Sequence, residues 1–378
     1  MTERFQREKP IEEKDDLLAE ARREINEVDA EMAKLFVRRM KAAEKVAAYK
    51  KAHALPILDA AREEAVVQSN AKLVEDETIR SYYVNFIRNN MAVSRAYQER
   101  LLHGMRVAYS GTEGAFAHIA AGKLFPGAER VAYGDFKAAY RAVENGECDT
   151  VVLPIENSYN GEVGQVTDLM FSGSLYVSEI LDLAVTHDLL VVPGTKKEDI
   201  REVVSHPQAL GQCAEYLRTY GWNTTEYTNT ALAARYVSEK GDPSVAAIAS
   251  EAAAEIFGLE VLERNINASR SNTTRFAAFS RVESRRHSKR MGEHFILLFT
   301  VKNEAGSLAR AMDVIGRFGF NMRTLRSRPM KELLWQYYFY VEAEGDVYTE
   351  AGEWMMRELS FFCDRLKLVG TYYNDQKS

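Results

Sequence analysis

Asn272-Thr273-Thr274-Arg275-Phe276 runs directly into the apolar Ala277-Ala278-Phe279, so a hydroxyl and a guanidinium stand at the start of a predicted β-strand. An Arg can bind a carboxylate through two charged hydrogen bonds, and a neighbouring Thr can pass a proton to a group that leaves the same anion. A Thr-Arg pair at a strand start is more often only solvated edge chemistry. The functional interpretation therefore depends on which other strand ends converge on this stretch.

Three other short apolar runs after Met105 also end in polar motifs, and helical stretches separate them. This order predicts an α/β fold with mostly parallel strands, in which ligands bind beyond the carboxyl ends of the strands. Each motif alone favours a turn, because glycine accepts positive φ, and His118 and His206 favour local hydrogen bonding over catalysis. The motifs are Ser110-Gly111-Thr112-Glu113-Gly114, Pro154-Ile155-Glu156-Asn157 and Ser205-His206-Pro207-Gln208, with Gln212 one helical turn later.

Together with the opening stretch, these motifs resemble the prephenate dehydratase family over residues 105–281. The resemblance implies a domain at 105–282 with two α/β lobes and a site in the cleft between them. The second lobe is expected at about 183–258, with the chain returning to the first lobe before the Thr-Arg-Phe motif. Ala115 and Ala117 stand where members of that family often have Ser or Thr.

The same resemblance implies a reaction in which prephenate loses CO2 and hydroxide to give phenylpyruvate, with Thr274 as the acid for the leaving hydroxyl. A Thr hydroxyl is a weak acid alone, so we expect Glu156, Asn157 and Gln212 to support it. We assign Arg275 to the pyruvyl carboxylate, because stabilising the carboxylate that departs as CO2 would lower the ground state and slow the step. The implied substrate-binding residues are Gly111, Gly114, Glu156, Asn157, Ser205, Gln208, Gln212, Asn272, Arg275 and Phe276.

In the first hundred residues, apolar positions from Leu18 to Tyr49 alternate between spacings of three and four, which predicts a helix packed along one seam. No Gly or Pro interrupts this stretch before Pro56. Such a helix needs other helices, from the same chain or from a second copy. Arg39 occupies a seam position, where an unpaired buried guanidinium would be destabilising, so it either snorkels to solvent or binds a ligand.

Lys50 follows Arg39 by eleven residues and returns to nearly the same face roughly 16 Å along the axis, so the two could bracket one small ligand. Arg22 and Arg39 are roughly 25 Å apart along the axis, so if both bind the same small molecule, one comes from a partner subunit. We expect a second helix with Asp59 and Glu63 on one face. A third helix is expected over about 77–102.

The resulting set resembles, position by position, the active-site pattern of the all-helical chorismate mutases over residues 17–103, in a domain at 1–104. The resemblance implies rearrangement of chorismate to prephenate by positioning and electrostatics alone. The two Arg would clamp the carboxylates, Lys50 and Gln98 would donate to the ether oxygen, and Glu63 with the backbone near Asp59 would hold the ring hydroxyl. The set is Arg22, Arg39, Lys50, Asp59, Glu63, Ser94 and Gln98.

The chain after the basic linker at 281–292 follows a βαββαβ order over 293–378, in an α+β module that resembles the ACT regulatory domain of phenylalanine-sensing dehydratases. A ligand carboxylate would meet free N–H groups where a helix opens at Gly306. Ser307 replaces the usual Ala, and Arg326 replaces Glu in the usual Glu-Ser-Arg-Pro motif. A dimerisation module without a ligand is the alternative. The implied phenylalanine site comprises Gly306, Ser307, Leu308, Ala309, Asn321, Ser327, Arg328 and Pro329.

Composition sets further limits. At 378 residues with 46% hydrophobic and 28% charged residues, the chain is expected to form two or three domains. A net charge of −6 gives no global attraction to nucleic acid or to an anionic membrane, and no run could span a bilayer. The charged start lacks an apolar signal core, and three scattered cysteines indicate a reducing compartment, so we expect a cytoplasmic protein.

The combined resemblances imply a multidomain homo-oligomer, dimer or tetramer, that carries out both reactions and is inhibited by L-phenylalanine. No metal or organic cofactor is implied. One rival is a mutase fused to prephenate dehydrogenase, but no Gly-x-Gly-x-x-Gly follows a predicted strand. The other rival is a mutase fused to a non-catalytic effector-binding module. Phenylpyruvate formation from prephenate without nicotinamide separates these interpretations.

Overall fold

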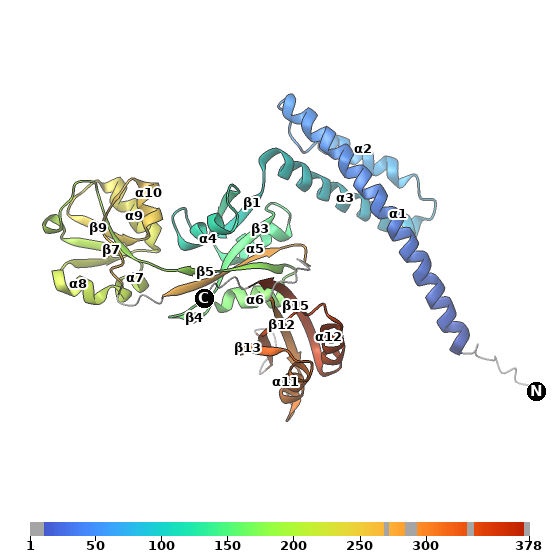
Figure 1. Cartoon of the computed structure of the whole chain (residues 1–378). Coiled ribbons are helices and arrows are strands. Elements are labelled where there is room, and N and C mark those ends of the chain that lie inside the picture. Colours follow the sequence, from blue (N-terminus) through green and yellow to red (C-terminus); the bar gives the residue numbers. More distant parts are fainter. Residues whose placement is uncertain (1–10, 268–271, 284–292, 331–335, 374–378) are drawn as a thin grey trace, which may run out of the picture. The chain divides into compact units, whose positions relative to one another are not determined.

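The computed structural model describes residues 11–267, 272–283, 293–330 and 336–373, and its side chains from Leu17 onward (Figure 1). The chain divides into two compact units, Met1–Gly104 and Met105–Ser378. Most of the linker expected at 281–292 lies outside the described residues.

The first unit is all helical in its described part. The long first helix ends before Pro56, and small buried side chains at Ala43 and Ala47 let it approach the third helix closely. Its N-terminal half carries apolar side chains that stay exposed, from 41% at Met32 to 62% at Leu35. The helices are α1 (Ile11–Ala52), α2 (Ala60–Ala71) and α3 (Glu77–His103).

The second unit begins with a lobe whose central strands alternate between two apolar faces. Val151 and Leu153 face α5 and α6, whereas Val152 faces α4. The strands run in the order β5-β11-β3-β1-β2, with β4 beside β3. They are β1 (Arg106–Ser110), β2 (Glu129–Tyr133), β3 (Thr150–Asn157), β4 (Gly161–Glu162), β5 (Tyr176–Ala184) and β11 (Thr273–Ser280). The helices are α4 (Phe116–Leu124), α5 (Phe136–Glu144) and α6 (Gly164–Ser172).

The second lobe has its own five-stranded sheet, ordered β10-β6-β9-β7-β8, with α7 and α8 on one face and α9 and α10 on the other (Figure 1). Its strands are β6 (Asp188–Val191), β7 (Glu202–Ser205), β8 (Asn223–Glu226), β9 (Val245–Ala249) and β10 (Glu260–Glu263). Its helices are η1 (Lys197–Asp199), α7 (Pro207–Gln212), α8 (Ala214–Tyr220), α9 (Thr230–Lys240) and α10 (Glu251–Phe257). The lobe therefore starts and ends a few residues later than the expected 183–258.

Both sheets are mixed, so the expectation of mostly parallel strands is wrong. The chain leaves the first lobe along β5 and returns along β11, which lies antiparallel to both β5 and β3. In the second lobe, β6 is antiparallel to β9 and β10, and only the pairs of β7 with β8 and β9 are parallel. The return before the Thr-Arg-Phe motif, which the sequence predicted, is present.

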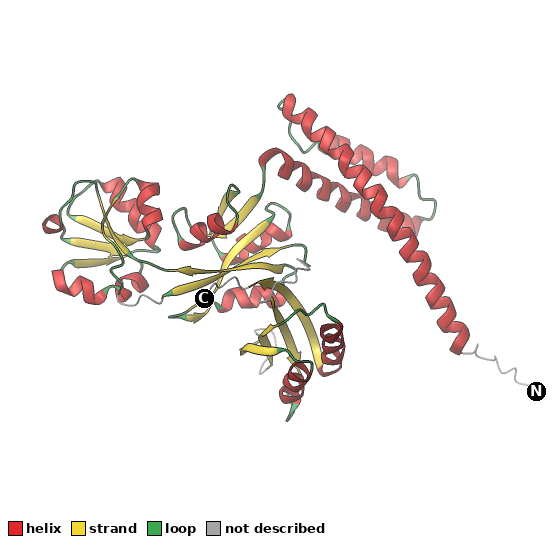
Figure 2. Cartoon of the chain, viewed as in Figure 1, coloured by secondary structure: helices red, strands yellow, loops and turns green. Residues whose placement is uncertain are grey.

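A βαββαβ module completes the second unit and packs its sheet against α6 (Figure 2). Phe295 and Leu297 face the module's own helices, while Ile296 and Leu298 face the first lobe, which explains the unbroken apolar run. At Gly370, which pairs with Val177 of β5, a Cβ atom would lie 2.1 Å from a backbone oxygen, so only glycine fits. The elements are β12 (Glu293–Val301), α11 (Ser307–Arg317), β13 (Asn321–Pro329), β14 (Tyr337–Glu344), α12 (Glu350–Phe362) and β15 (Cys363–Tyr373).

The described residues contain neither a candidate membrane span nor a candidate metal cluster. No helix among them has the length and apolar character needed to cross a membrane. No group of three or more His, Cys, Asp or Glu side chains in that part of the chain is placed to hold a metal ion.

Candidate active sites

A cavity of about 480 Å³ in the second unit is lined by residues of both α/β lobes. Helices α4 and α9 begin at its wall, because Ala115, Phe116, Asn229 and Thr230 are among the lining residues. The polar lining residues that the sequence singled out are Asn157, Gln208, Gln212, Asn272 and Thr274.

A chain of side-chain hydrogen bonds connects the second lobe to Thr274 along this wall. Asn157 Nδ2 donates to Thr274 Oγ1 and to Asn272 Oδ1, each at 2.9 Å. Asn272 Nδ2 donates to Gln212 Oε1 at 2.9 Å, and His187 Nε2 lies 2.8 Å from the same oxygen. Because Gln212 Oε1 accepts in both contacts, His187 carries its proton on Nε2.

The backbone fixes the orientation of Asn157. Its Oδ1 accepts from the N–H groups of Tyr159 and Asn160, both at 3.0 Å, in the manner of an Asx turn. Nδ2 is thereby directed at Thr274, whose hydroxyl accepts this bond and keeps its own proton to donate. Thr274 can therefore protonate a ligand in the cavity, while the Asn157 N–H group stabilises the oxygen that remains.

His187 is a cavity residue that the sequence reasoning missed. It is buried and makes an edge contact with the Phe116 ring. Burial lowers the pKa of His187, although the hydrogen bond to Gln212 and the charge of Asp188 oppose the shift, so the ring is neutral at pH 7. A lone His just before an apolar run carries no spacing signal. Its role becomes visible only through its contact with Gln212.

Four other predicted residues lie near the cavity but are not among its lining residues. The β1–α4 loop has positive φ at Gly111 and Gly114, and a Cβ at Gly114 would touch side chains of the second lobe at 3.4 Å. Ser205 is buried, and its hydroxyl donates to the Ile248 carbonyl at 2.6 Å, linking two strands of that lobe. Phe276 is buried in the core of the first lobe. Their contacts are structural.

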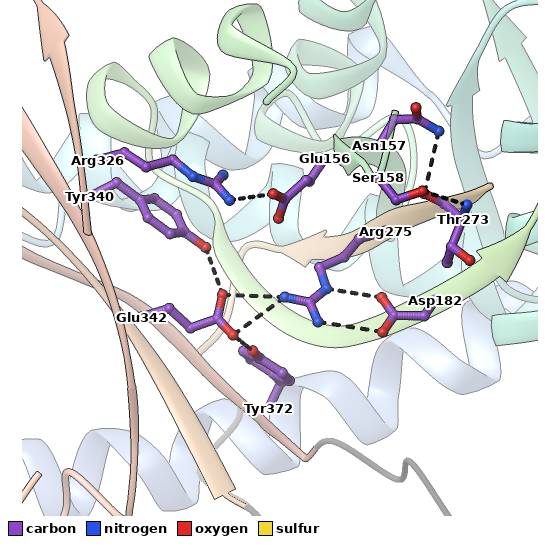
Figure 3. Close-up of polar contacts among 10 residues, drawn as sticks. All are labelled: Glu156, Asn157, Ser158, Asp182, Thr273, Arg275, Arg326, Tyr340, Glu342 and Tyr372. Carbon is purple, nitrogen blue, oxygen red and sulfur yellow. Dashed lines mark hydrogen bonds and ion pairs between the residues drawn. The ribbon is translucent and has the colours of Figure 1, made fainter. Parts of the chain in front are cut away.

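Glu156 and Arg275 do not line the cavity, contrary to expectation. Arg275 donates to Asp182 at 2.9 Å and lies 3.4 Å from Glu342, while Glu156 pairs with Arg326 (Figure 3). Arg275 directly follows Thr274 on a regularly paired stretch of β11, so its side chain points to the opposite face. On β3 the cause is a β-bulge at Ile155, where the pairing with β11 shifts by one residue. The bulge brings Asn157 onto the cavity face beside Thr274 and turns Glu156 to the opposite face beside Arg275.

In the helical unit, the structure brings Arg39, Ser94 and Gln98 together. Arg39 Nη1 donates to Asn90 Oδ1 at 3.1 Å and also contacts the Ser94 hydroxyl, so it is held against α3 and does not snorkel to solvent. Gln98 Nε2 donates to the Ser94 carbonyl at 3.2 Å. Gln98 Oε1 is buried without a partner among the described residues, which leaves one polar atom for a ligand.

The remaining residues of the helical set are spread around this group. Lys50 donates to the Ile57 carbonyl, and Glu63 pairs with Arg95. Asp59 is the N-cap of α2 and accepts from the Arg62 N–H at 2.9 Å, so it does not share a helix face with Glu63 as expected. Arg22 lies on the exposed N-terminal half of α1.

The C-terminal module has a cavity of about 460 Å³ beside the start of α11, and Leu308 lines it. Gly306 is the N-cap with φ of 83° and no side-chain cap, which leaves N–H groups open, whereas Ser307 is buried and accepts from Arg310. Ala309 is exposed. On the other predicted stretch, Asn321 donates to Glu344, and Ser327, Arg328 and Pro329 lie on β13. Arg328 contacts Asp168 of the first lobe at 3.2 Å rather than the cavity beside α11.

Two family models match this chain: prephenate dehydratase over residues 107–284, and chorismate mutase type II over residues 21–99. A bifunctional chorismate mutase/prephenate dehydratase from Enterobacter agglomerans is 30% identical over 373 residues, which cover 95% of this chain and 96% of that protein.

Two solved structures resemble this chain over 72% of its length. A structure described as GqqA, a novel type of quorum quenching acylase, is 30% identical with a TM-score of 0.66, covering 72% of this chain and 98% of that one. A prephenate dehydratase from Arthrobacter aurescens in complex with L-Phe is 25% identical with a TM-score of 0.66, covering 72% of this chain and 92% of that one.

Proposed function

This chain belongs to the family of bifunctional chorismate mutase/prephenate dehydratases, and from that premise we propose how its two units make phenylpyruvate from chorismate. The first unit rearranges chorismate to prephenate, and the second removes CO2 and hydroxide from prephenate. The observation that carries the second assignment is the hydrogen bond from Asn157 Nδ2 to Thr274 Oγ1 at the cavity. The test is phenylpyruvate formation from prephenate without nicotinamide. Neither a dehydrogenase nor a non-catalytic effector-binding module would give that product.

The dehydration needs one proton donor. As the bond to the departing CO2 breaks, its electrons move into the ring and expel the hydroxyl from the opposite carbon. Thr274 gives that hydroxyl a proton, so water leaves, and the Asn157 N–H group stabilises the Thr oxygen until solvent returns a proton. The network through Asn272 and Gln212 to His187 holds Asn157 in this orientation.

The substrate carboxylates need partners other than Arg275. Helix α4 begins at the cavity with Ala115 as an N-cap that offers no side-chain bond, so its first N–H groups are open to a ligand. Helix N-termini bind anions through such groups and through the helix dipole. We therefore assign the pyruvyl carboxylate to the start of α4. An Ala N-cap, in place of Ser or Thr, suits this role because no hydroxyl competes for the N–H groups.

The mutase reaction needs two cations on one dianion. Arg39 is already oriented by Asn90 and Ser94 and supplies one, while Lys50 and Gln98 supply donors for the ether oxygen. Glu63, with the backbone near Asp59, would hold the ring hydroxyl, after exchanging its contact with Arg95 for one with the substrate. Positioning and electrostatics of this kind are sufficient for a pericyclic rearrangement.

The second cation, Arg22, would come from a partner subunit. On one straight helix it is roughly 25 Å from Arg39 along the axis. The exposed apolar side chains around it would be covered if α1 packed against α1 of a second copy. These side chains include Leu18, Ile25, Val28, Met32 and Leu35. The proposed assembly is a homo-oligomer built from such dimers. Recovery of mutase activity when Arg22 and Arg39 variants exchange subunits would test this assembly.

L-phenylalanine would inhibit the dehydratase through the C-terminal module, which we assign as an ACT domain. The open N–H groups at Gly306 and the adjacent cavity support a site for an amino acid, and the Arthrobacter aurescens structure contains L-Phe. Inhibition requires that the ligand bind one state of the enzyme more tightly than the other.

The proposed location is cytoplasmic, supported by three cysteines that form no disulfide.

The contacts of Thr274 do not support an acylase activity, which the description of one structural relative suggests. Acyl transfer needs a nucleophile activated by a hydrogen-bonded base. Thr274 instead accepts a hydrogen bond from the Asn157 amide, which cannot take its proton.

A further inference from the structure

Two neighbouring rungs of the β3–β11 ladder carry side chains to opposite faces of the sheet. One rung pairs Asn157 with Thr274, and their side chains are hydrogen-bonded at the cavity. The next rung pairs Glu156 with Arg275. Adjacent rungs share a continuous backbone, so the position of the second rung limits the position of the first.

The C-terminal module holds both members of the second rung (Figure 3). Arg326 on β13 pairs with Glu156, and Glu342 on β14 lies 3.4 Å from Arg275. The two ion pairs, Arg326–Glu156 and Glu342–Arg275, form what we call the clasp. The two module residues lie 170 and 67 positions from their partners in the chain, so only folding brings them together.

The module's half of the clasp is itself fixed. Glu342 is only 4% exposed and accepts from the hydroxyls of Tyr340 and Tyr372. Arg326 lies over the Tyr340 ring, with its guanidinium carbon 5.6 Å from the ring centroid. Arg275 pairs with Asp182 in addition to Glu342, so each of the three carboxylates in the group has a guanidinium partner. Rigid, paired side chains of this kind can hold a strand in place.

We propose that Arg326 and Glu342 are positioning residues for the dehydration, which act through Glu156 and Arg275 to place Asn157 and Thr274. The inference rests on the proposed dehydratase function and deepens it. The Thr274 proton must reach the leaving hydroxyl, and a misplacement of about 1 Å reduces a rate by about a hundredfold. Movement of β13 against β3 would reach Thr274 through a single rung.

Other contacts keep the module docked when the clasp is broken. Arg328 contacts Asp168 at 3.2 Å, and Arg365 donates to the Phe171 carbonyl at 2.7 Å. The Phe171 and Tyr338 rings stack with centroids 4.3 Å apart. Loss of Arg326 alone therefore changes how the strand is held without removing the module.

The test measures kcat and KM for prephenate in the full chain carrying Arg326→Gln, Glu156→Gln or both. We expect each single change to lower kcat by about ten- to a hundredfold with KM nearly unchanged, and Arg326→Lys to restore most of the loss. The double variant should be no slower than the slower single variant, because both changes break the same ion pair. Each variant should keep the wild-type mutase activity, because that reaction takes place in the first unit.

Arg323→Gln is the matched control. Arg323 lies on β13, as Arg326 does, but it pairs with Glu344 of the module and not with a residue of the first lobe. The control change should leave kcat unchanged. The inference is overturned if folded Arg326→Gln retains wild-type kcat, or if the losses of the two single variants multiply in the double variant. Absence of dehydratase activity in the wild-type chain would instead overturn the proposed function.

Discussion

Replacement of Asn157 by Asp tests the hydrogen-bond logic of the dehydratase cavity. The change keeps the shape of the side chain and the Oδ1 that accepts from Tyr159 and Asn160. It replaces the Nδ2 donor with a carboxylate oxygen. Thr274 must then donate its proton to that oxygen, and the proton is no longer available to the substrate.

The structure sets the size of the effect. Asn157 Nδ2 donates two hydrogen bonds of 2.9 Å, to Thr274 and to Asn272, and the Asp variant loses both. Loss of one donor that stabilises a developing negative oxygen lowers kcat by about a hundred- to a thousandfold, or about 2.7–4 kcal/mol. Two acceptors would also face each other at Asn272 Oδ1, which destabilises the fold by about 1–3 kcal/mol.

The assay is phenylpyruvate formation from saturating prephenate, with chorismate mutase activity of the same preparation as the internal control. We expect Asn157→Asp to lower dehydration by at least about a hundredfold and to leave mutase activity unchanged. A folded variant that keeps more than about a tenth of the wild-type kcat would refute the assignment of Asn157 as the donor to Thr274.

Three further experiments test other parts of the account. Arg22→Ala and Arg39→Ala should each abolish mutase activity. Mixing the two variants under subunit exchange should return roughly one quarter of wild-type activity, because half of the dimers are mixed and each mixed dimer has one intact site. No recovery despite demonstrated exchange would contradict a site shared between subunits. Gly306→Val, at a φ of 83°, should weaken phenylalanine binding by about tenfold or more in calorimetry while dehydration persists, and undiminished inhibition would contradict the site. Burial lowers the pKa of His187, so the folded state holds this ring neutral more strongly than the unfolded state does. The stability that His187 contributes is therefore complete above the unfolded pKa of about 6.5. Below that pH the free energy of unfolding falls by up to about 1.4 kcal/mol per pH unit. His187→Gln should therefore flatten the fall in melting temperature between about pH 7 and pH 5, and an unchanged slope would contradict a buried neutral ring.

In the helical unit, periodicity predicted most of the structure. The third helix was expected over about 77–102 and spans Glu77–His103. The prediction that Asp59 lies within the second helix was wrong, because its carboxylate caps α2. The spacing of four residues to Glu63 is the same in both cases, so it could not distinguish them. The apolar residues of the N-terminal half of α1 were expected to pack, but they stay exposed among the described residues of the first unit.

In the α/β unit, the motifs predicted which residues approach the cavity better than which way they face. Asn157 and Thr274 reach it, whereas their neighbours Glu156 and Arg275 turn away. For Arg275, strand alternation after Thr274 was enough to predict the opposite face. For Glu156, the single extra residue at Ile155 decides the face, and a β-bulge leaves no spacing signal in the sequence. Arg326 was recognised as a departure from a family motif. Its partner lies 170 positions away, so no local pattern could have indicated the ion pair.

Thr274→Ala tests the central claim most directly, because the two activities belong to separate units of one chain. Prephenate formation from chorismate and phenylpyruvate formation from prephenate should be measured on the same purified variant. The account predicts that dehydration is lost while prephenate formation stays at the wild-type rate. Dehydration at the wild-type rate by a folded Thr274→Ala variant would contradict it.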